Sequence, residues 1–200
     1  MQKLHDKGKV DARVLSHAQA ALVPVQGLAE LAECDLVIEA IVEQLEAKQA
    51  LMRDLESVVS PHALLATNTS SLSVTAIAAG LKRPERVAGF HFFNPVPLMK
   101  VVEVIDGALT APSVSEALLK LGQRMGHTAV RAQDTPGFIV NHAGRGYGTE
   151  ALRVLSERVA TVEDIDRVLR DTAGFRLGPF ELMDLTGLDV SHPVMAVSYT

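Results

Sequence analysis

The fold of this chain is decided by the stretch Val87-Ala88-Gly89-Phe90-His91-Phe92-Phe93-Asn94-Pro95-Val96-Pro97. Its first seven residues are apolar apart from one histidine, which predicts a short and mostly buried strand. The strand has to end before the prolines, because each proline removes a backbone donor and fixes φ. His91 is therefore expected near the end of a strand, where open α/β sheets display their catalytic groups.

A second ionisable residue, Glu103, follows in the apolar run Val101-Val102-Glu103-Val104-Ile105. Burying an unpaired carboxylate costs on the order of several kcal/mol, so Glu103 needs a partner, and His91 is the nearest candidate across the turn. A histidine with an orienting carboxylate is the arrangement that general acid–base catalysis requires. The residues leave an alternative open: a core histidine bonded to a backbone carbonyl, and a glutamate on an exposed strand face.

The composition is that of an ordinary globular protein, with 200 residues, 48% hydrophobic and 22% charged, and a net charge of -5. The apolar runs are too short for a membrane span and the first residues lack a secretory signal, so we expect no membrane partner. A single cysteine, Cys34, excludes an internal disulfide framework and favours a cytoplasmic location. The mild acidity and the lack of a basic tract argue against a nucleic-acid partner. The seven histidines are scattered, so no metal site is expected.

Short apolar runs alternate with helical patterns up to about residue 133, which is typical of a parallel α/β sheet. The predicted strands are 36–40, 64–67, 87–93, 101–105 and 128–131, and the predicted helices are 45–59, 74–79 and 113–125. Ser71 or Ser73 can cap the helix over 74–79.

The pattern changes after the turn-rich junction Asp134-Thr135-Pro136-Gly137, where strand signals disappear. Helical segments are predicted over 138–158, 162–171 and 180–185, and Thr161 supplies a start signal for the second of them. We therefore expect two domains, residues 1–133 and residues 134–200.

Five strings occur in order along the chain: DLVIEAIVE at 35–43, TNTSSL at 67–72, HFFNPVP at 91–97, DTPGFIVN at 134–141 and GPFEL at 178–182. Together they resemble the L-3-hydroxyacyl-CoA dehydrogenase family, over about residues 4–190. The resemblance implies an α/β fold, a partial Rossmann-type parallel sheet followed by a helical domain. It also implies oxidation of the 3-hydroxyl of an acyl-CoA to a ketone, with NAD as cofactor, in fatty-acid or aromatic-acid catabolism. The complete protein is expected to be a homodimer.

The resemblance also assigns roles to individual residues. His91 matches the general base that takes the hydroxyl proton, and Glu103 matches the carboxylate that orients its imidazole. Ser70 and Asn141 match donors that position the substrate oxygens. Asn94 matches a residue beside both the histidine and the nicotinamide, and Ser70 is also expected at the cofactor. On the residues alone, Ser70 can also be a capping or turn residue.

Glu43 and Lys48 match positions that touch the dinucleotide in the family. An acid and a lysine five residues apart at the start of a helix are also typical of a solvated surface. This structural alternative stays open at the level of sequence.

The chain departs from the family pattern in one important respect. It has no Gly-x-Gly-x-x-Gly turn after a strand and no acidic residue after a second strand to select NAD over NADP. The cluster Gly144, Gly146 and Gly148 has another spacing and falls in a predicted helix, where each glycine costs about 1 kcal/mol. These glycines either admit a neighbouring helix or loosen their own. We expect part of a longer dehydrogenase that alone binds NAD poorly.

Two other functions remain as alternatives. The chain could be a non-catalytic remnant that acts as a binding or assembly module, which the missing dinucleotide turn favours. It could also be a family relative that oxidises a small hydroxy acid or sugar acid, since such enzymes share the histidine–glutamate pair. The acyl-chain length of the substrate cannot be derived from these residues.

Overall fold

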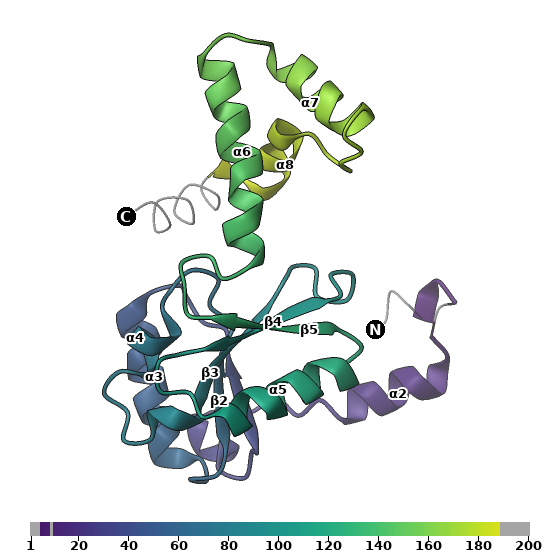
Figure 1. Ribbon diagram of the computed structural model, residues 1–200. Coiled ribbons are helices and arrows are strands. Elements are labelled where there is room, and N and C mark those ends of the chain that lie inside the picture. Colours follow the sequence, from purple (N-terminus) through teal and green to yellow (C-terminus); the bar gives the residue numbers. More distant parts are fainter. Residues whose placement is uncertain (1–4, 9, 189–200) are drawn as a thin grey trace.

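The computed structural model describes residues 5–8 and 10–188. The end of the second expected domain, residues 189–200, lies outside that range. Five strands form one sheet in the order β1-β2-β3-β4-β5, and Figure 1 shows this sheet at the centre of the lower part of the molecule. The strands are β1 (Leu36–Glu39), β2 (Leu64–Thr67), β3 (Val87–Phe92), β4 (Val101–Asp106) and β5 (Thr128–Gln133). All five follow the predicted segments to within two residues.

The sheet is not entirely parallel, which corrects one expectation. The pairs β1–β2, β2–β3 and β4–β5 are parallel, whereas β3 and β4 are antiparallel. A parallel crossover takes about a dozen residues or more, and the connection over 93–100 is too short for one. The antiparallel register places His91 directly opposite Glu103.

Helices cover both faces of the sheet and complete two apolar cores (Figure 1). On one face α3 (Leu45–Val58) and α4 (Val74–Ala78) pack over Leu65, Val87 and Ile105. On the other face α5 (Pro112–Arg124) packs over a second set of buried side chains: Ala66, Ala88, Phe90, Val102 and Val104. Successive strand residues thus alternate between the two cores, as the pleat requires.

The helix α4 begins at the residue that the sequence indicated and is anchored by a distant carboxylate. Ser73 is the N-cap, and its hydroxyl accepts from the Ala76 amide. Asp134, which follows β5, accepts from the Ser73 hydroxyl at 2.7 Å and from the amides of Val74 at 2.9 Å and Thr75 at 2.8 Å. The start of the predicted interdomain junction is therefore fixed to the sheet part of the molecule.

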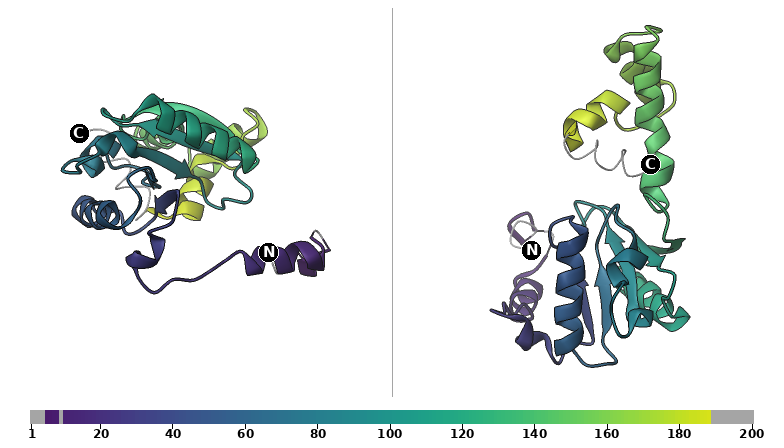
Figure 2. Two further views of the ribbon diagram at one scale, coloured as in Figure 1. Left: turned by 90° about the horizontal axis from the view of Figure 1, so that it is seen from below. Right: turned by 90° about the vertical axis from the view of Figure 1, so that its left-hand side faces the viewer.

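Three helices follow the junction and stand apart from the sheet (Figures 1 and 2). They are α6 (Val140–Ser156), α7 (Val162–Asp171) and α8 (Pro179–Thr186), close to the predicted bounds. Thr161 caps α7 as expected. Buried Asp166 on α7 accepts from the amides of Phe180 at 2.9 Å and Glu181 at 3.0 Å, which ties α7 to the start of α8.

The glycines of α6 differ in their surroundings. A Cβ added to Gly148 would lie 2.9 Å from the Met183 side chain of α8, whereas one added to Gly144 or Gly146 would meet nothing within 4 Å. Of the two explanations offered by the sequence, close approach of a second helix therefore applies to Gly148 alone.

The N-terminal part of the structure extends away from the sheet. Helix α2 (Ala12–Ala20) lies beyond a connection whose side chains include exposed Leu22 and Val23 (Figure 2, left). Two short 3-10 helices, η1 (Leu28–Leu31) and η2 (Pro84–Arg86), precede β1 and β3.

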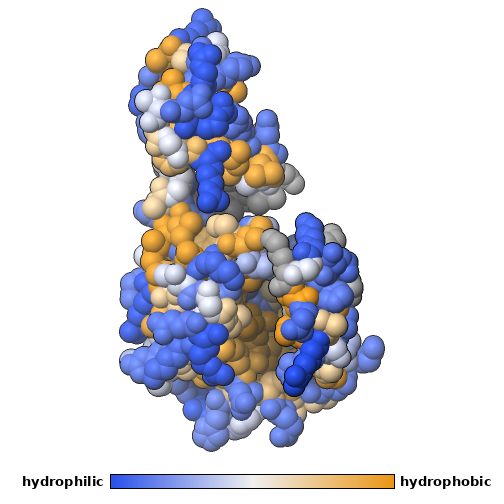
Figure 3. Space-filling model, turned by 90° about the vertical axis from the view of Figure 1, so that its right-hand side faces the viewer, coloured by the Kyte–Doolittle hydropathy of each residue, from blue (hydrophilic) through white to orange (hydrophobic). Residues whose placement is uncertain are grey.

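Strand β1 forms one edge of the sheet, and exposed apolar side chains lie on it and just after it. Ile38 on the strand and Ile41 and Val42 just after it are exposed. Figure 3 shows an apolar hollow on one side of the molecule.

Across 5–8 and 10–188, none of the helices combines the length and the apolar character needed to cross a bilayer.

Candidate active site

The polar groups of the candidate site lie where β1, β2 and β3 end. Glu39 and Thr67 are the last residues of their strands and His91 is the next to last. All three point to the sheet face covered by α3 and α4, because they share the alternation of Leu65 and Val87. The site therefore forms at the carboxyl edge of parallel strands, which is the usual place in open α/β sheets.

His91 and Glu103 form a buried hydrogen-bonded pair. The His91 Nδ1 atom lies 2.7 Å from Glu103 Oε2, and the two residues are 4% and 0% exposed. An ionised carboxylate only accepts hydrogen bonds, so Nδ1 carries a proton, and in the neutral imidazole the lone pair is on Nε2. The histidine is thereby in the tautomer that a general base requires.

The second oxygen of Glu103 contacts the helical part of the chain. Glu103 Oε1 accepts from the amides of Ile139 at 2.9 Å and Val140 at 2.8 Å, where α6 begins. Burial by itself would raise the pKa of Glu103, but hydrogen bonds from His91, Val140 and Ile139 outweigh it and hold the pKa below the usual value. Glu103 is therefore ionised near neutral pH.

Aromatic rings enclose the imidazole of His91. The ring of Phe93 lies 4.4 Å from it and the ring of Phe138 lies 5.7 Å from it, centroid to centroid. Phe138 is buried and has a φ of 50°, which a bulky residue rarely adopts. A low-polarity surrounding of this kind strengthens the hydrogen bond between His91 and Glu103.

Glu43 lies above the end of β2 and binds the loop that carries Ser70. Its Oε1 atom accepts from the Thr69 hydroxyl at 2.5 Å and from the amides of Ser70 at 3.0 Å and Ser71 at 3.2 Å. Burial by itself raises the pKa of Glu43. The hydrogen bonds from Thr69 and Ser70 and the charge of Lys48 together lower it by more than burial raises it, so the pKa lies below the usual value. Glu43 thus keeps a negative charge beside Ser70.

Lys48 is buried, so the interpretation of this residue as solvated surface is wrong. The side chain is 1% exposed, and its Nζ lies 2.6 Å from Glu39 Oε1 and 3.2 Å from Glu43 Oε2. The Lys48 ammonium thus forms ion pairs with two carboxylates of the site, those of Glu39 and Glu43. Contact with a dinucleotide stays a prediction for Glu43, which is half exposed, and has less support for Lys48.

Glu39 is a site residue that the sequence analysis did not identify. It is 3% exposed and also accepts from the Thr67 hydroxyl at 2.7 Å. The available signal was the same one that revealed Glu103, a carboxylate inside an apolar strand run. Asn68 was missed as well: its Oδ1 accepts from the Phe92 amide at 2.8 Å and links the ends of β2 and β3.

The remaining predicted residues lie around this centre. Asn141, in the first turn of α6, donates from Nδ2 to the Ser70 carbonyl at 3.4 Å, which joins two residues that were expected to contact the same substrate. Asn94 is exposed in the loop after β3, and its bond to Pro95 is cis. Its position beside His91 and the nicotinamide stays a prediction.

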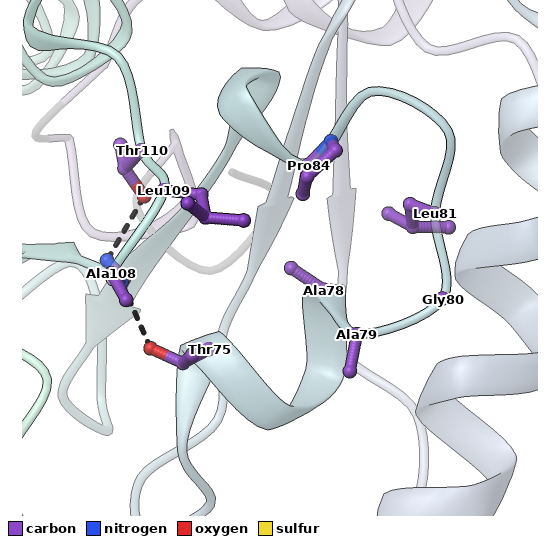
Figure 4. Close-up of a pocket in the computed structure, with 10 residues that line it drawn as sticks. Thr75, Ala78, Ala79, Gly80, Leu81, Pro84, Ala108, Leu109 and Thr110 are labelled. Atoms are coloured by element: carbon purple, nitrogen blue, oxygen red, sulfur yellow. Dashed lines mark hydrogen bonds between the residues drawn. The ribbon is translucent and has the colours of Figure 1, made fainter.

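An apolar cavity of about 250 Å³ lies elsewhere, at the opposite end of β3 (Figure 4). It is formed by α4, by the segment that leads to Pro84 and by the turn after β4, and the Thr75 hydroxyl accepts from the Ala108 amide beside it at 2.9 Å. Its lining carries no acid–base pair.

Within the part of the chain that the structure covers, no group of three or more His, Cys, Asp or Glu side chains could hold a metal.

Two family models match this chain. The model for the 3-hydroxyacyl-CoA dehydrogenase NAD-binding domain matches residues 1–135, and the model for the C-terminal domain of the same family matches residues 137–200. Two of the most similar curated proteins are the 3-hydroxyadipyl-CoA dehydrogenase of Escherichia coli (53% identical) and the 3-hydroxybutyryl-CoA dehydrogenase of Clostridioides difficile (39% identical).

These matches cover nearly all of this chain but only part of its relatives. The aligned regions are 94% and 100% of this chain, and 40% and 71% of the two curated proteins. A crystal structure of a 3-hydroxybutyryl-CoA dehydrogenase from Escherichia coli K12 superimposes with a TM-score of 0.97 at 50% identity, over 99% of this chain and 42% of that one. The chain belongs to the 3-hydroxyacyl-CoA dehydrogenase family.

Proposed function

We propose that this chain carries the proton-transfer part of an NAD-dependent L-3-hydroxyacyl-CoA dehydrogenase. The observation that carries the proposal is the buried pair of His91 and Glu103, with Nδ1 and Oε2 2.7 Å apart at the carboxyl edge of the sheet. His91 Nε2 takes the proton of the substrate 3-hydroxyl while C3 becomes a ketone. Glu103 holds the imidazole and stabilises its charged form during that transfer.

NAD supplies the hydride acceptor when it is bound. Glu43, Ser70 and Asn94 fit such a cofactor site, because they lie in the segments that follow β1, β2 and β3, at the same edge of the sheet as His91. No described residue is assigned to the pyrophosphate, since these 200 residues contain no Gly-x-Gly-x-x-Gly turn.

The substrate is proposed to be an acyl-CoA thioester. Ser70 and Asn141, which are linked by a hydrogen bond of 3.4 Å, are placed to position its oxygens without adding a competing acid or base. The similar proteins are named for 3-hydroxyadipyl-CoA and 3-hydroxybutyryl-CoA, so both thioesters belong in the assay.

We further propose that two copies associate in the cytoplasm through the helical part, with the domain division at residues 133 and 134. The helical part exposes many large apolar side chains for its size, including Leu152, Val168, Phe175, Leu182 and Leu185. Contact between two such surfaces would bury them.

The test is NADH formation by the natural protein that contains these residues, with each of the two thioesters and NAD. Replacing His91 by glutamine should lower kcat by about 10²- to 10⁴-fold, the usual contribution of a general base. His62→Gln, at an exposed histidine, is the matched control and should keep the rate of the parent protein. Equal rates for the His91 variant and the parent would refute the assignment. Absence of turnover in a folded parent protein would favour a binding module instead.

A further inference from the structure

Glu103 has a second set of partners that an orienting carboxylate does not need. It is fully buried, and its two oxygens are divided between different parts of the chain: Oε2 contacts His91 of β3, and Oε1 accepts from the amides of Ile139 and Val140. Both amide contacts are shorter than 3 Å, as expected for hydrogen bonds to an ionised acceptor.

The two amides belong to a helix that has no cap of its own. Helix α6 is 17 residues long, and its N-cap residue, Ile139, cannot accept a hydrogen bond through its side chain. The first amides of a helix have no partner within the helix, and a carboxylate there is also favoured by the helix dipole. Glu103 therefore does for α6 what Ser73 and Thr161 do for α4 and α7.

The chain before α6 is shaped so that these amides turn back toward the sheet. Gly137 and Phe138 both have positive φ, 77° and 50°, which reverses the backbone just before Ile139. A Cβ at Gly137 would lie 3.0 Å from the His142 amide, so this turn leaves little room for a side chain. Asp134 fixes the other end of the same segment to α4.

We propose that Glu103 is the positioning residue for α6 as well as for His91, so that one carboxylate keeps the base and Asn141 in register across the interdomain junction. Asn141 follows Val140 directly, so the bond from Glu103 to the Val140 amide also fixes where the Asn141 side chain starts. The consequence for catalysis rests on the proposed function, but the positioning itself can be measured without turnover.

The arrangement makes an unusual prediction for Glu103→Gln. Glutamine has one accepting oxygen and one donating NH₂ group, and the two backbone amides can only be satisfied by the oxygen. The NH₂ group must then face Nδ1 of His91, which can accept only if its proton has moved to Nε2. The variant should therefore invert the tautomer of His91. If Glu103 merely oriented His91, the glutamine oxygen would face Nδ1 and the tautomer would stay as it is.

The experiment is ¹⁵N NMR of the histidine rings in the full chain at neutral pH, with the His91 signals identified by their loss in His91→Gln. We expect protonated Nδ1 in the parent protein and protonated Nε2 in Glu103→Gln. Retention of protonated Nδ1 in that variant would overturn the proposal. Glu30→Gln is the matched control, because Glu30 also accepts two backbone amides, from Gln26 and Gly27, at the surface. The signals of His127 serve as an internal reference.

A second variant keeps the proposal testable if the first does not fold. Glu103→Asp retains the charge but is one methylene shorter, so it cannot reach both His91 and α6. We expect it to lose the contact to α6, seen as amide exchange at Ile139 and Val140 at least about 10-fold faster than in the parent protein, or to lose the contact to His91, seen in the ring signals. An aspartate variant that retained both contacts would contradict the proposal. A failure of dehydrogenase activity would leave these measurements unaffected and would count against the proposed function alone.

Discussion

At the scale of the residue, the site depends on two buried carboxylates, Glu39 and Glu103, and on the partly exposed carboxylate of Glu43, each of which has hydrogen-bond or ion-pair partners. Glu39 and Glu43 share one ammonium, from Lys48, while Glu103 relies on neutral donors. Buried charges are tolerated only when their partners are in place, so each of these residues is more important for stability than a surface charge would be.

Lys48→Met tests this dependence. The substitution preserves the length of the side chain but leaves Glu39, which is 3% exposed, without its cation. We expect the free energy of unfolding to fall by about 3–5 kcal/mol, as for other buried pairs that lose one member. Urea denaturation measures the change, with Lys82→Met at an exposed lysine as control. Adding Glu39→Gln to Lys48→Met should recover part of the loss, and a loss below about 1 kcal/mol would contradict the interpretation.

The lowered pKa of Glu103 has a consequence for stability as a function of pH. A carboxyl whose pKa is lower in the folded state than in the unfolded state stabilises the fold above the unfolded value, here near 4.5. That stabilisation disappears as the pH falls through the lowered pKa. We therefore expect stability to decline from about pH 5 downward, and Glu103→Gln to make the decline shallower. Urea titrations at several pH values measure it, and parallel curves for both proteins would speak against the assignment.

At the scale of the element, the period and spacing of apolar residues were sufficient to predict most of the structure. Every predicted strand and helix is present because each combines a regular pattern with a clear stop, such as Pro61 after α3 or Gly174 after α7. The direction of β4 could have been inferred from the short connection before it. The burial of Lys48 could not, because it depends on where Glu39 lies in three dimensions.

The glycines in two helices should respond in opposite ways to alanine. A Cβ at Gly122 in α5 would lie 2.8 Å from Val102 Cγ1 and 3.0 Å from Ala129 Cβ, whereas one at Gly144 in α6 would meet nothing. Gly122→Ala should destabilise the protein by about 1–3 kcal/mol through overpacking, and Gly144→Ala should stabilise it by up to about 1 kcal/mol. Thermal unfolding of the two variants provides the comparison. Stabilisation by both substitutions would show that helix propensity, not packing, decides.

At the scale of the whole molecule, most of the buried apolar surface belongs to the sheet part. Within α6, α7 and α8, the buried hydrophobic residues are Ala151, Ile165 and Met183, whereas the sheet has a core on each face, to which Phe138 also contributes. Regions with few buried contacts open at a lower free energy than the global transition. The sequence could indicate the two parts by their patterns, but not this difference, because burial depends on how α6, α7 and α8 are arranged.

Native-state hydrogen exchange should reveal this difference directly. Amides in α7 and α8 should exchange through openings of lower free energy than amides in β2 and β3. The measurement is exchange at increasing low concentrations of denaturant, with the β3 amides as the reference within the same sample. If α7 amides were as protected as those of β3, the two parts would form one cooperative unit.

The antiparallel register of β3 and β4 fixes the pairing of His91 with Glu103 independently of most of the loop that connects the two strands. His91 and Glu103 face each other because of the ladder between the two strands, and residues 94–100 of the connection supply no hydrogen bond to that pair. This part of the connection, which carries exposed Leu98 and Met99, can therefore gain or lose residues without displacing His91 from Glu103. Over evolution, such a loop can change in length and sequence while the pairing of His91 with Glu103 is inherited unchanged.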